Sequence, residues 1–349
     1  MTTAGLETGL SVHAPETDLI GVFAEGGAFE PETVHTHYFG FQVPDAGIGA
    51  YTYIRYQPWF PLCQGGVVIF RGLDHRVPLD AAYLDYRMAM PYPAVDGSRI
   101  TTANGYAVEF IELGRRARIT YGSPEAAFDI TQVAVTPLVA RGAVIPGENL
   151  HASHEPGGSE QFMHCTGELW LRGATYPVDC YMPRDRSWRQ SRTEARGGRH
   201  DPPIAWTPMY FPEADLAFNQ VGFESPGTDA VWDGALSLPP GFPGHHFAWV
   251  WRGGALRPVV AVRRSVDALH PCVPAPLRQT IMAEDAAGVT YRFTGEALAL
   301  APIPAWPNAG AYDSVVRWTD EAGRIGYGPC QGIWYDAFQR LAQERGHGR

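Results

Sequence analysis

The stretch that decides the fold is Gly167-Glu168-Leu169-Trp170-Leu171-Arg172-Gly173-Ala174-Thr175-Tyr176-Pro177-Val178-Asp179-Cys180. Apolar and polar side chains alternate in it on both sides of Arg172-Gly173. A period of two is typical of strands with one buried face, and a two-residue turn that contains glycine joins antiparallel strands tightly. The stretch therefore predicts a β-hairpin.

The residues that follow this hairpin carry the strongest signal for chemistry. They read Cys180-Tyr181-Met182-Pro183-Arg184-Asp185-Arg186-Ser187-Trp188-Arg189-Gln190-Ser191-Arg192 and combine several arginines with a carboxylate and an indole. We expect Asp185 to lie just past the second strand, in a connection that also carries Trp188 and is too charged to be buried without partners.

The composition favours an all-β chain. The 349 residues are 45% hydrophobic and 12% aromatic, which is enough for a sizeable core. Charged residues make up 18%, whereas glycine (39) and proline (30) are abundant. This balance predicts many short elements joined by tight turns rather than long helices.

Several classes of partner are not expected. The net charge is -10, and the arginine clusters lie among acidic residues, which argues against nucleic acid as a partner. The sequence contains no Gly-x-Gly-x-x-Gly that opens a helix, no Walker loop and no Gly-x-Ser-x-Gly elbow. We therefore expect no nucleotide cofactor.

The location of the protein is predicted from what the sequence does not contain. The N-terminal sequence lacks the basic start and apolar run of a secretory signal, and no apolar stretch approaches the ~18 residues of a membrane span. Five widely spaced cysteines without a Cys-x-x-Cys pair favour reduced thiols in or near the core. We therefore predict a cytoplasmic protein without a membrane span.

The pattern of strands and turns predicts an arm and two domains. Residues 1–34 are expected to form an N-terminal arm, residues 35–148 a first β-barrel, and residues 149–349 a second β-barrel. The boundary is placed at the connection-like stretch of residues 142–149. A short helix is expected over residues 333–342, because Trp334, Phe338 and Leu341 recur at helical spacing.

Three groups of histidines could be interpreted as metal ligands. They are His35-Thr36-His37, His151 with His154, and His245-His246. Two histidines separated by one residue share a face of a strand, as some metal sites require. A matching carboxylate motif is missing, so no metal site is predicted.

The tetrad Asp185-Arg186-Ser187-Trp188, together with Tyr38-Phe39-Gly40-Phe41 and Gly326-Tyr327-Gly328, resembles segments of a lipocalin-like (calycin) two-domain superfamily. This superfamily includes the carotenoid 1,2-hydratases (hydroxyneurosporene synthases) and the AttH-type proteins. The resemblance implies two antiparallel barrels side by side and, in the hydratase branch, cofactor-free addition of water to an isolated double bond of a terpenoid. Two positions depart from the pattern, because Arg186 replaces histidine and Arg189 replaces glycine.

The function predicted from these observations is cofactor-free acid–base catalysis of hydratase, lyase or isomerase type. The substrate is expected to be a hydrophobic small molecule, such as a terpenoid, a steroid-like or an aromatic compound, held in a barrel pocket. The expected catalytic residues are Asp185, Arg186, His164 and Tyr210. The expected substrate-binding residues are Trp188, Arg192, His37, Tyr51, Tyr53 and Glu213.

Three alternatives remain open at this point. The protein could be a non-catalytic lipocalin-like binder of an apolar ligand, or a carbohydrate-active β-sandwich. Asp185 could also form a salt bridge with Arg186 or Arg192 that only braces the fold, while the tyrosines and histidines pack in strands. A homodimer is compatible with each of these interpretations.

Overall fold

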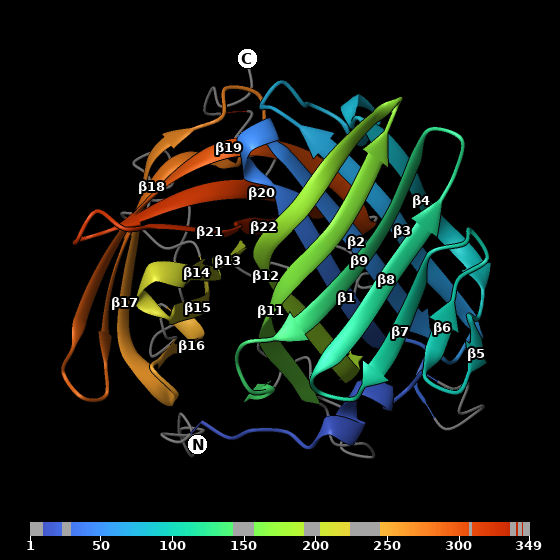
Figure 1. The fold of residues 1–349 in the computed structure, drawn as a ribbon, viewed down its shortest axis with the longest axis horizontal. Coiled ribbons are helices and arrows are strands. Elements are labelled where there is room, and N and C mark those ends of the chain that lie inside the picture. The colour runs from blue at the N-terminus through green and yellow to red at the C-terminus, as the bar shows by residue number, and fades with distance from the viewer. Residues whose placement is uncertain are drawn as a thin grey trace.

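Two antiparallel sheets account for most of the chain in the computed structural model (Figure 1). The structure describes residues 10–22, 29–141, 157–191, 203–223, 245–306 and 309–335, together with Arg340 and Glu344. Four short 3-10 helices lie within these ranges: η1 (Pro15–Leu19), η2 (Pro44–Ala46), η3 (Pro78–Asp80) and η4 (Pro212–Ala214). None of the helices in the described ranges has the length and apolar character that a membrane crossing requires.

The first sheet has twelve strands and curls into a half-barrel, in the order β4-β3-β2-β1-β12-β11-β9-β8-β7-β6-β5, with β10 paired to β11. Its strands are β1 (Thr33–Val43), β2 (Ile48–Gln57), β3 (Leu62–Arg71), β4 (Tyr83–Pro91), β5 (Ala94–Asp96), β6 (Arg99–Thr101), β7 (Ala107–Glu112), β8 (Arg116–Gly122), β9 (Ala126–Ala134), β10 (Val139–Arg141), β11 (Gly157–Leu171) and β12 (Ala174–Ser191).

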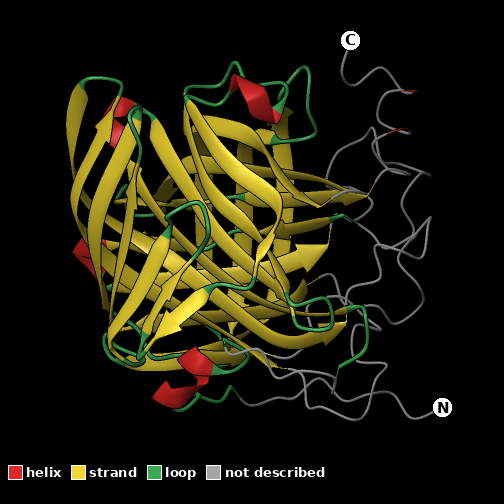
Figure 2. Cartoon of the chain, turned by 90° about the vertical axis from the view of Figure 1, so that its right-hand side faces the viewer, coloured by secondary structure: helices red, strands yellow, loops and turns green. Residues whose placement is uncertain are grey.

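The second sheet has ten strands and closes on itself, because β13 pairs with β15 and β20 with β21 in addition to the main order β13-β22-β20-β19-β18-β17-β16-β15-β14-β21. Its strands are β13 (Ile204–Trp206), β14 (Met209–Phe211), β15 (Leu216–Phe223), β16 (His245–Arg252), β17 (Ala255–Leu269), β18 (Pro276–Asp285), β19 (Thr290–Trp306), β20 (Ala309–Asp320), β21 (Ile325–Pro329) and β22 (Gln331–Tyr335). Figure 2 shows that strands dominate both halves of the molecule.

The hairpin expected around Arg172-Gly173 is the pair β11–β12, with Leu171 opposite Ala174. Both turn residues have positive φ, 47° and 89°, as a tight turn of the primed type requires. The all-β fold predicted from the sequence is confirmed, and its two antiparallel sheets agree with the expected lipocalin-like two-domain architecture.

Two details of the predicted organisation differ from the structure. β11 and β12 follow the expected boundary at 148–149 and yet pair within the first sheet, so the chain passes between the sheets after Ser191. Residues 333–335 form part of β22, because Ile333 pairs with Ile204 and Ala311 in the second sheet. The helix expected from residue 333 therefore does not begin there. Arg340 and Glu344 are helical, and the rest of that stretch lies outside the described residues.

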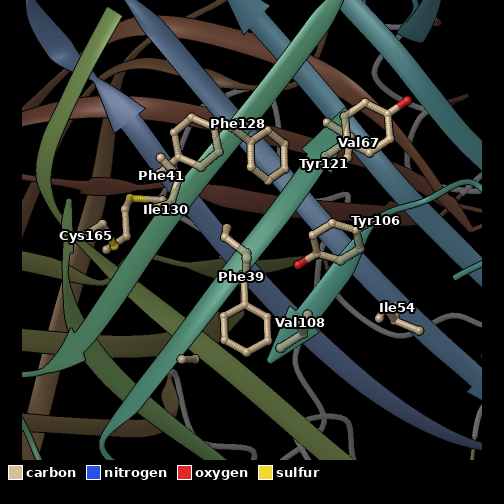
Figure 3. Close-up of a cluster of buried hydrophobic side chains, with 14 of the residues drawn as sticks. Phe39, Phe41, Ile54, Val67, Tyr106, Val108, Tyr121, Phe128, Ile130 and Cys165 are labelled. Carbon is tan, nitrogen blue, oxygen red and sulfur yellow. The ribbon is translucent and has the colours of Figure 1, made fainter. Parts of the chain in front are cut away.

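Alternation along the strands of the first sheet gives each strand two different faces. The concave face forms the core of the first barrel, where Phe39, Phe41, Tyr106, Phe128 and Ile130 pack together (Figure 3). The residues between them, such as Tyr38, point to the opposite face and contact the second sheet. A site between the two sheets is therefore lined by the side chains of this opposite face.

The N-terminal segment lies against the first barrel. Val12 forms a bridge with Val139, and the backbone N–H of Ala140 donates to Ser11. This segment carries Asp18, which is 1% exposed and enters the barrel.

Candidate active site between the sheets

The tetrad Asp185-Arg186-Ser187-Trp188 lies inside strand β12, so its expected position past the strand end is wrong. Asp185 is the register partner of Tyr38, and Arg186 is the partner of His37. Since successive side chains of a strand point to opposite faces, Asp185 faces the second sheet and Arg186 faces the barrel core. Trp188 contacts Arg186 and therefore does not share a face with Asp185.

Arg186 and His37 belong to a buried polar group inside the first barrel. Arg186 donates from Nε to the Thr17 carbonyl at 3.2 Å and from Nη1 to the Thr36 carbonyl at 3.1 Å. Burial lowers the pKa of Arg186 to about 10. His37 is hydrogen-bonded to the Tyr56 hydroxyl and to the carbonyl of Asp18, and burial, reinforced by Arg186, holds its pKa well below the usual range.

The neighbouring Arg184 forms a buried ion pair with Asp18. Arg184 Nη1 and Nη2 lie 2.8 and 3.2 Å from the two carboxylate oxygens, and Asp18 also accepts the backbone N–H of Gly114 at 2.7 Å. These contacts fasten the N-terminal segment to the barrel. Arg184, Arg186 and His37 therefore have structural partners on this inner face.

Trp188 also packs under the N-terminal segment. Its ring lies 5.0 Å from that of His13 in an edge-on arrangement, and the side chain is 5% exposed. A Cβ on Gly157 would lie within 2.5 Å of the indole, so the glycine makes room for the ring. The position of Trp188 fits packing rather than contact with a substrate near Asp185.

The face toward the second sheet holds two carboxyls around one guanidinium. Arg141 Nη2 lies 2.6 Å from Asp185 Oδ2, and Arg141 Nε lies 3.5 Å from Glu160 Oε1. Glu160 is the direct register partner of Asp185 across β11 and β12. Asp185 makes the closer contact with Arg141, so the attraction between Arg141 and Glu160 is the weaker of the two.

Glu160 is joined to the second sheet by a hydrogen-bonded chain. Trp206 Nε1 donates to Asn219 Oδ1 at 2.8 Å, which orients the amide so that Asn219 Nδ2 donates to Glu160 Oε2. Burial raises the pKa of Glu160 to about 8, and Asp185 adds to this effect, while Arg141, Asn219 and Trp206 oppose it. Arg141, Glu160, Asp185, Asn219 and Trp206 are called the interface acid cluster below.

Tyrosines form a wall beside this cluster. Tyr38, Tyr51 and Tyr53 are each 6% exposed or less, and neighbouring rings lie 5.2 and 5.6 Å apart. Tyr38 also contacts Trp206 at 5.5 Å. Tyr51 and Tyr53 thus lie on the same face of the first sheet as Asp185.

A second buried acid lies in the second sheet, on the face that is turned toward the first sheet. Asp313 in β20 is 3% exposed, and burial raises the pKa of its carboxyl to about 8 although Oδ1 accepts the Ser314 backbone N–H at 2.9 Å. Burial, with a further contribution from Asp313, raises the pKa of Tyr38 well above its usual range. The Gln331 side chain is close enough to lower the pKa of both groups, although its Nε2 has no partner within hydrogen-bonding geometry among the described residues.

The remaining predicted residues lie elsewhere. His164 Nε2 is 2.6 Å from Asp179 Oδ1, and its ring stacks on Tyr181, which stacks in turn on Tyr210. This column joins the two sheets away from the acid cluster, and the Tyr210 hydroxyl donates to Asp215 at 2.8 Å. Glu213 is exposed in η4, and Arg192 lies outside the described residues.

Arg141, Glu160, Asn219, Trp206 and Asp313 were not among the predicted site residues. One signal for Glu160 was present in the sequence. Counting outward from the turn at Arg172-Gly173 places Glu160 opposite Asp185, which is the observed register. No comparable signal exists for Arg141, Asn219 or Asp313, because they come from other hairpins.

The interface acid cluster has the components of proton transfer. An acid whose pKa lies near neutrality can both donate and accept a proton, and the neighbouring guanidinium can stabilise negative charge. In the part of the chain that the structure describes, no group of three or more histidine, cysteine, aspartate or glutamate side chains is arranged to hold a metal ion.

Comparison with known proteins gives one family and several structures. No curated protein matches the chain in sequence. The structure of CghA with Sch210972 has a TM-score of 0.54 at 13% identity, covering 87% of this chain and 89% of that chain. A second structure of CghA has a TM-score of 0.52 at 12% identity, covering 87% and 88%.

Kievitone hydratase from Nectria haematococca has a TM-score of 0.45 at 11% identity, covering 90% of this chain and 93% of that chain. The likeness to CghA is one of fold and agrees with the lipocalin-like architecture. A family model described as "Domain of unknown function (DUF7064)" matches residues 27–335. Because this match extends over most of its length, the chain belongs to the DUF7064 family.

Proposed function

We propose that the protein is a cofactor-free acid–base enzyme of hydratase, lyase or isomerase type. Its substrate is a hydrophobic small molecule that binds between the two sheets. The observation that carries this proposal is the buried carboxyl of Glu160, whose pKa is raised to about 8 beside a guanidinium already engaged by Asp185. A carboxyl that keeps its proton near neutral pH is the usual form of a general acid.

The surroundings of Glu160 explain why it keeps its proton. Two carboxyls next to one guanidinium cannot both ionise cheaply in a buried site, because the second negative charge has no full counter-charge. Asp185 has the shorter contact with Arg141, so the positive charge of Arg141 stabilises ionised Asp185 more than ionised Glu160. In this scheme Glu160 donates the proton, and Asp185 is a positioning residue that acts through Arg141.

The tyrosine wall supports an apolar substrate. Tyr38, Tyr51 and Tyr53 share a buried cluster with five alanines of β19 and β20, which are Ala299, Ala301, Ala305, Ala309 and Ala311. Aromatic rings opposite small side chains suit a flat hydrophobic molecule. This composition also makes sugars less suitable ligands, since their hydroxyls need many polar partners.

The proposal is tested by solvent exchange, since a reversible proton transfer to carbon labels the substrate. The purified protein is incubated in D2O with a panel of terpenoids, steroid ketones and aromatic enones, and products are analysed by mass spectrometry. We expect deuterium incorporation or addition of water for at least one class. Glu160→Gln should reduce the rate by a factor of about 100 or more.

Glu168→Gln is the matched control, because Glu168 lies on the same strand and is exposed. Its rate should equal that of the unaltered protein. Binding of a panel compound without any exchange would favour the non-catalytic binder, and equal rates for Glu160→Gln and the unaltered protein would exclude Glu160 as the proton donor.

A further inference from the structure

Four residues on adjacent strands of the first sheet form a continuous row. Tyr53 pairs with Tyr38, Tyr38 with Asp185, and Asp185 with Glu160, across β2, β1, β12 and β11. Neighbouring strands are about 4.8 Å apart, so the Cα atoms of Tyr38 and Glu160 are separated by roughly 10 Å. A small molecule that touches Tyr38 can therefore present another of its atoms to Glu160.

The Tyr38 end of this row has polar atoms with unused hydrogen-bonding capacity. Among the residues that the structure describes, Tyr38 Oη and Gln331 Nε2 are buried and make no hydrogen bond. Buried polar atoms in native proteins are rarely left without partners, so each exception calls for an explanation, such as a bound water or ligand. Tyr38 is 2% exposed as a whole, so bulk solvent does not satisfy its hydroxyl.

Asp313 adds a third polar group to this end. It is 3% exposed and lies opposite Gln331, because Tyr312 pairs with Gly332 and Val315 pairs with Pro329 on the facing strands. Because burial raises its pKa to about 8, the carboxyl is largely protonated near neutral pH and can donate a hydrogen bond. Tyr38, Asp313 and Gln331, called the donor triad below, thus offer an O–H, a carboxyl O–H and an amide N–H.

The chemistry of the donor triad fits an uncharged oxygen acceptor. A carbonyl oxygen has two lone pairs and accepts such donors, whereas a hydrocarbon would leave all of them unsatisfied. A carboxylate or phosphate ligand is disfavoured, because it would place a further negative charge beside Asp185 in a buried site. The surrounding alanines and tyrosines suit the apolar remainder of the molecule.

We infer that the substrate is an α,β-unsaturated ketone or the corresponding β-hydroxy ketone, and that the donor triad binds its carbonyl oxygen. This inference rests on the proposed function and specifies its substrate class. In this arrangement the conjugated system O=C–C=C lies along the row, with its oxygen at the donor triad and its α-carbon toward Glu160. Hydrogen bonds to the carbonyl oxygen withdraw electrons from the double bond and stabilise the enolate that forms when water attacks the β-carbon. This addition therefore has a lower barrier than protonation of an isolated alkene.

The balanced reaction needs only water. In the hydration direction the oxygen of water bonds to the β-carbon, the carbon–carbon π bond breaks, and the α-carbon takes a proton from Glu160. The proton released by the water restores the Glu160 carboxyl. The ketone oxygen is unchanged at the end, and the reverse sequence is the dehydration of a β-hydroxy ketone.

The test compares two probes that differ in the carbonyl group, trans-chalcone and trans-stilbene. Their dissociation constants are measured by tryptophan fluorescence quenching, since Trp206 contacts Tyr38. We expect the unaltered protein to bind trans-chalcone at least tenfold more tightly than trans-stilbene. Tyr38→Phe and Gln331→Leu should each bring the ratio of the two constants close to one.

Two controls separate this inference from the proposed function. Tyr176→Phe alters a β12 tyrosine that packs against the first-barrel core and should keep the full ratio. Glu160→Gln should also keep the ratio while it loses turnover. Absence of turnover with a preserved ratio would overturn the enzyme proposal alone, whereas equal affinities, or no measurable binding of trans-chalcone, would overturn the ketone inference.

Tyr38→Phe also distinguishes a ligand-binding role from a structural one. Because Tyr38 Oη makes no hydrogen bond among the described residues, its removal should not lower the thermal unfolding midpoint. A clear fall in the midpoint would show that the hydroxyl supports the fold, and would overturn the inference.

Discussion

Glu160 and Asp185 lie opposite each other on β11 and β12, and the guanidinium of Arg141 contacts both carboxyls. The arrangement divides two similar side chains into different roles. Asp185 neutralises the arginine at 2.6 Å, and Glu160 keeps a raised pKa in a buried position. Environment rather than residue type separates acid from counter-ion in such pairs.

The first prediction concerns the pH dependence of turnover. If protonated Glu160 is the acid, kcat/KM is highest below the pKa of about 8 and falls as the pH rises through it. Asp185→Asn removes a negative neighbour and frees Arg141 for Glu160, so the falling limb should move to lower pH by about one unit. The measurement is a pH profile of kcat/KM for both proteins. If the falling limb of the kcat/KM profile does not shift in Asp185→Asn, the charge of Asp185 does not affect the pKa of the proton donor.

The second prediction concerns stability. The folded-state pKa of Asp313 is about 8, compared with 3.8 for an unperturbed aspartate, so the unfolded chain loses this proton first as the pH rises. Asp313 therefore makes the free energy of unfolding decrease between about pH 4 and 8. Asp313→Asn should remove up to roughly 1.4 kcal/mol per pH unit of this decrease. Urea unfolding at pH 5, 6, 7 and 8 measures it, and parallel curves for the two proteins would contradict it.

The third prediction concerns the ion pair between Asp18 and Arg184. Asp18→Ala leaves a buried guanidinium without its carboxylate next to Arg186, and should lower the free energy of unfolding by about 3–5 kcal/mol. Glu16→Gln serves as the control, because Glu16 is exposed in the same helix and its loss should change stability by less than about 0.5 kcal/mol. Equal stabilities for the two variants would show that the N-terminal segment is not anchored by this pair.

The fourth prediction compares two tryptophans. Trp188→Phe loosens the packing against His13 and should lower stability by roughly 1–3 kcal/mol, with kcat/KM unchanged. Trp206→Phe removes the donor that orients Asn219 and should lower kcat/KM by up to roughly 100-fold. Steady-state kinetics and urea unfolding of both variants provide the comparison. A fall in kcat/KM for Trp188→Phe, without one for Trp206→Phe, would instead place Trp188 at the substrate site.

The fold was largely readable from local signals. The Arg172-Gly173 turn and the period-two pattern around it predict β11 and β12, and the abundance of glycine and proline predicts short strands. The end of β12 was missed because Arg184, Asp185 and Arg186 are too charged for an ordinary buried strand. Their partners Asp18 and Arg141 come from distant parts of the sequence, so local reasoning could not show that these charges are satisfied.

The candidate site was predictable only in part. The sequence predicts Asp185, Tyr51 and Tyr53 as site residues, and all three face the second sheet, since residue type and strand position are local properties. The opposite orientations of Asp185 and Trp188 also follow from a period of two once both are placed in one strand. The pairing of Glu160 with Asn219 and the position of Asp313 depend on how two sheets pack, which no local pattern contains.

The position of β1 between β2 and β12 has a consequence for biosynthesis. During translation β2 can pair with β1 at once, whereas β12 leaves the ribosome much later. One edge of β1 therefore stays open through most of the synthesis of the first sheet, and open edges of this kind promote aggregation of nascent chains. Closure of that edge by β12 is a contact between distant parts of the chain, so we expect slow folding and a need for chaperones in heterologous expression.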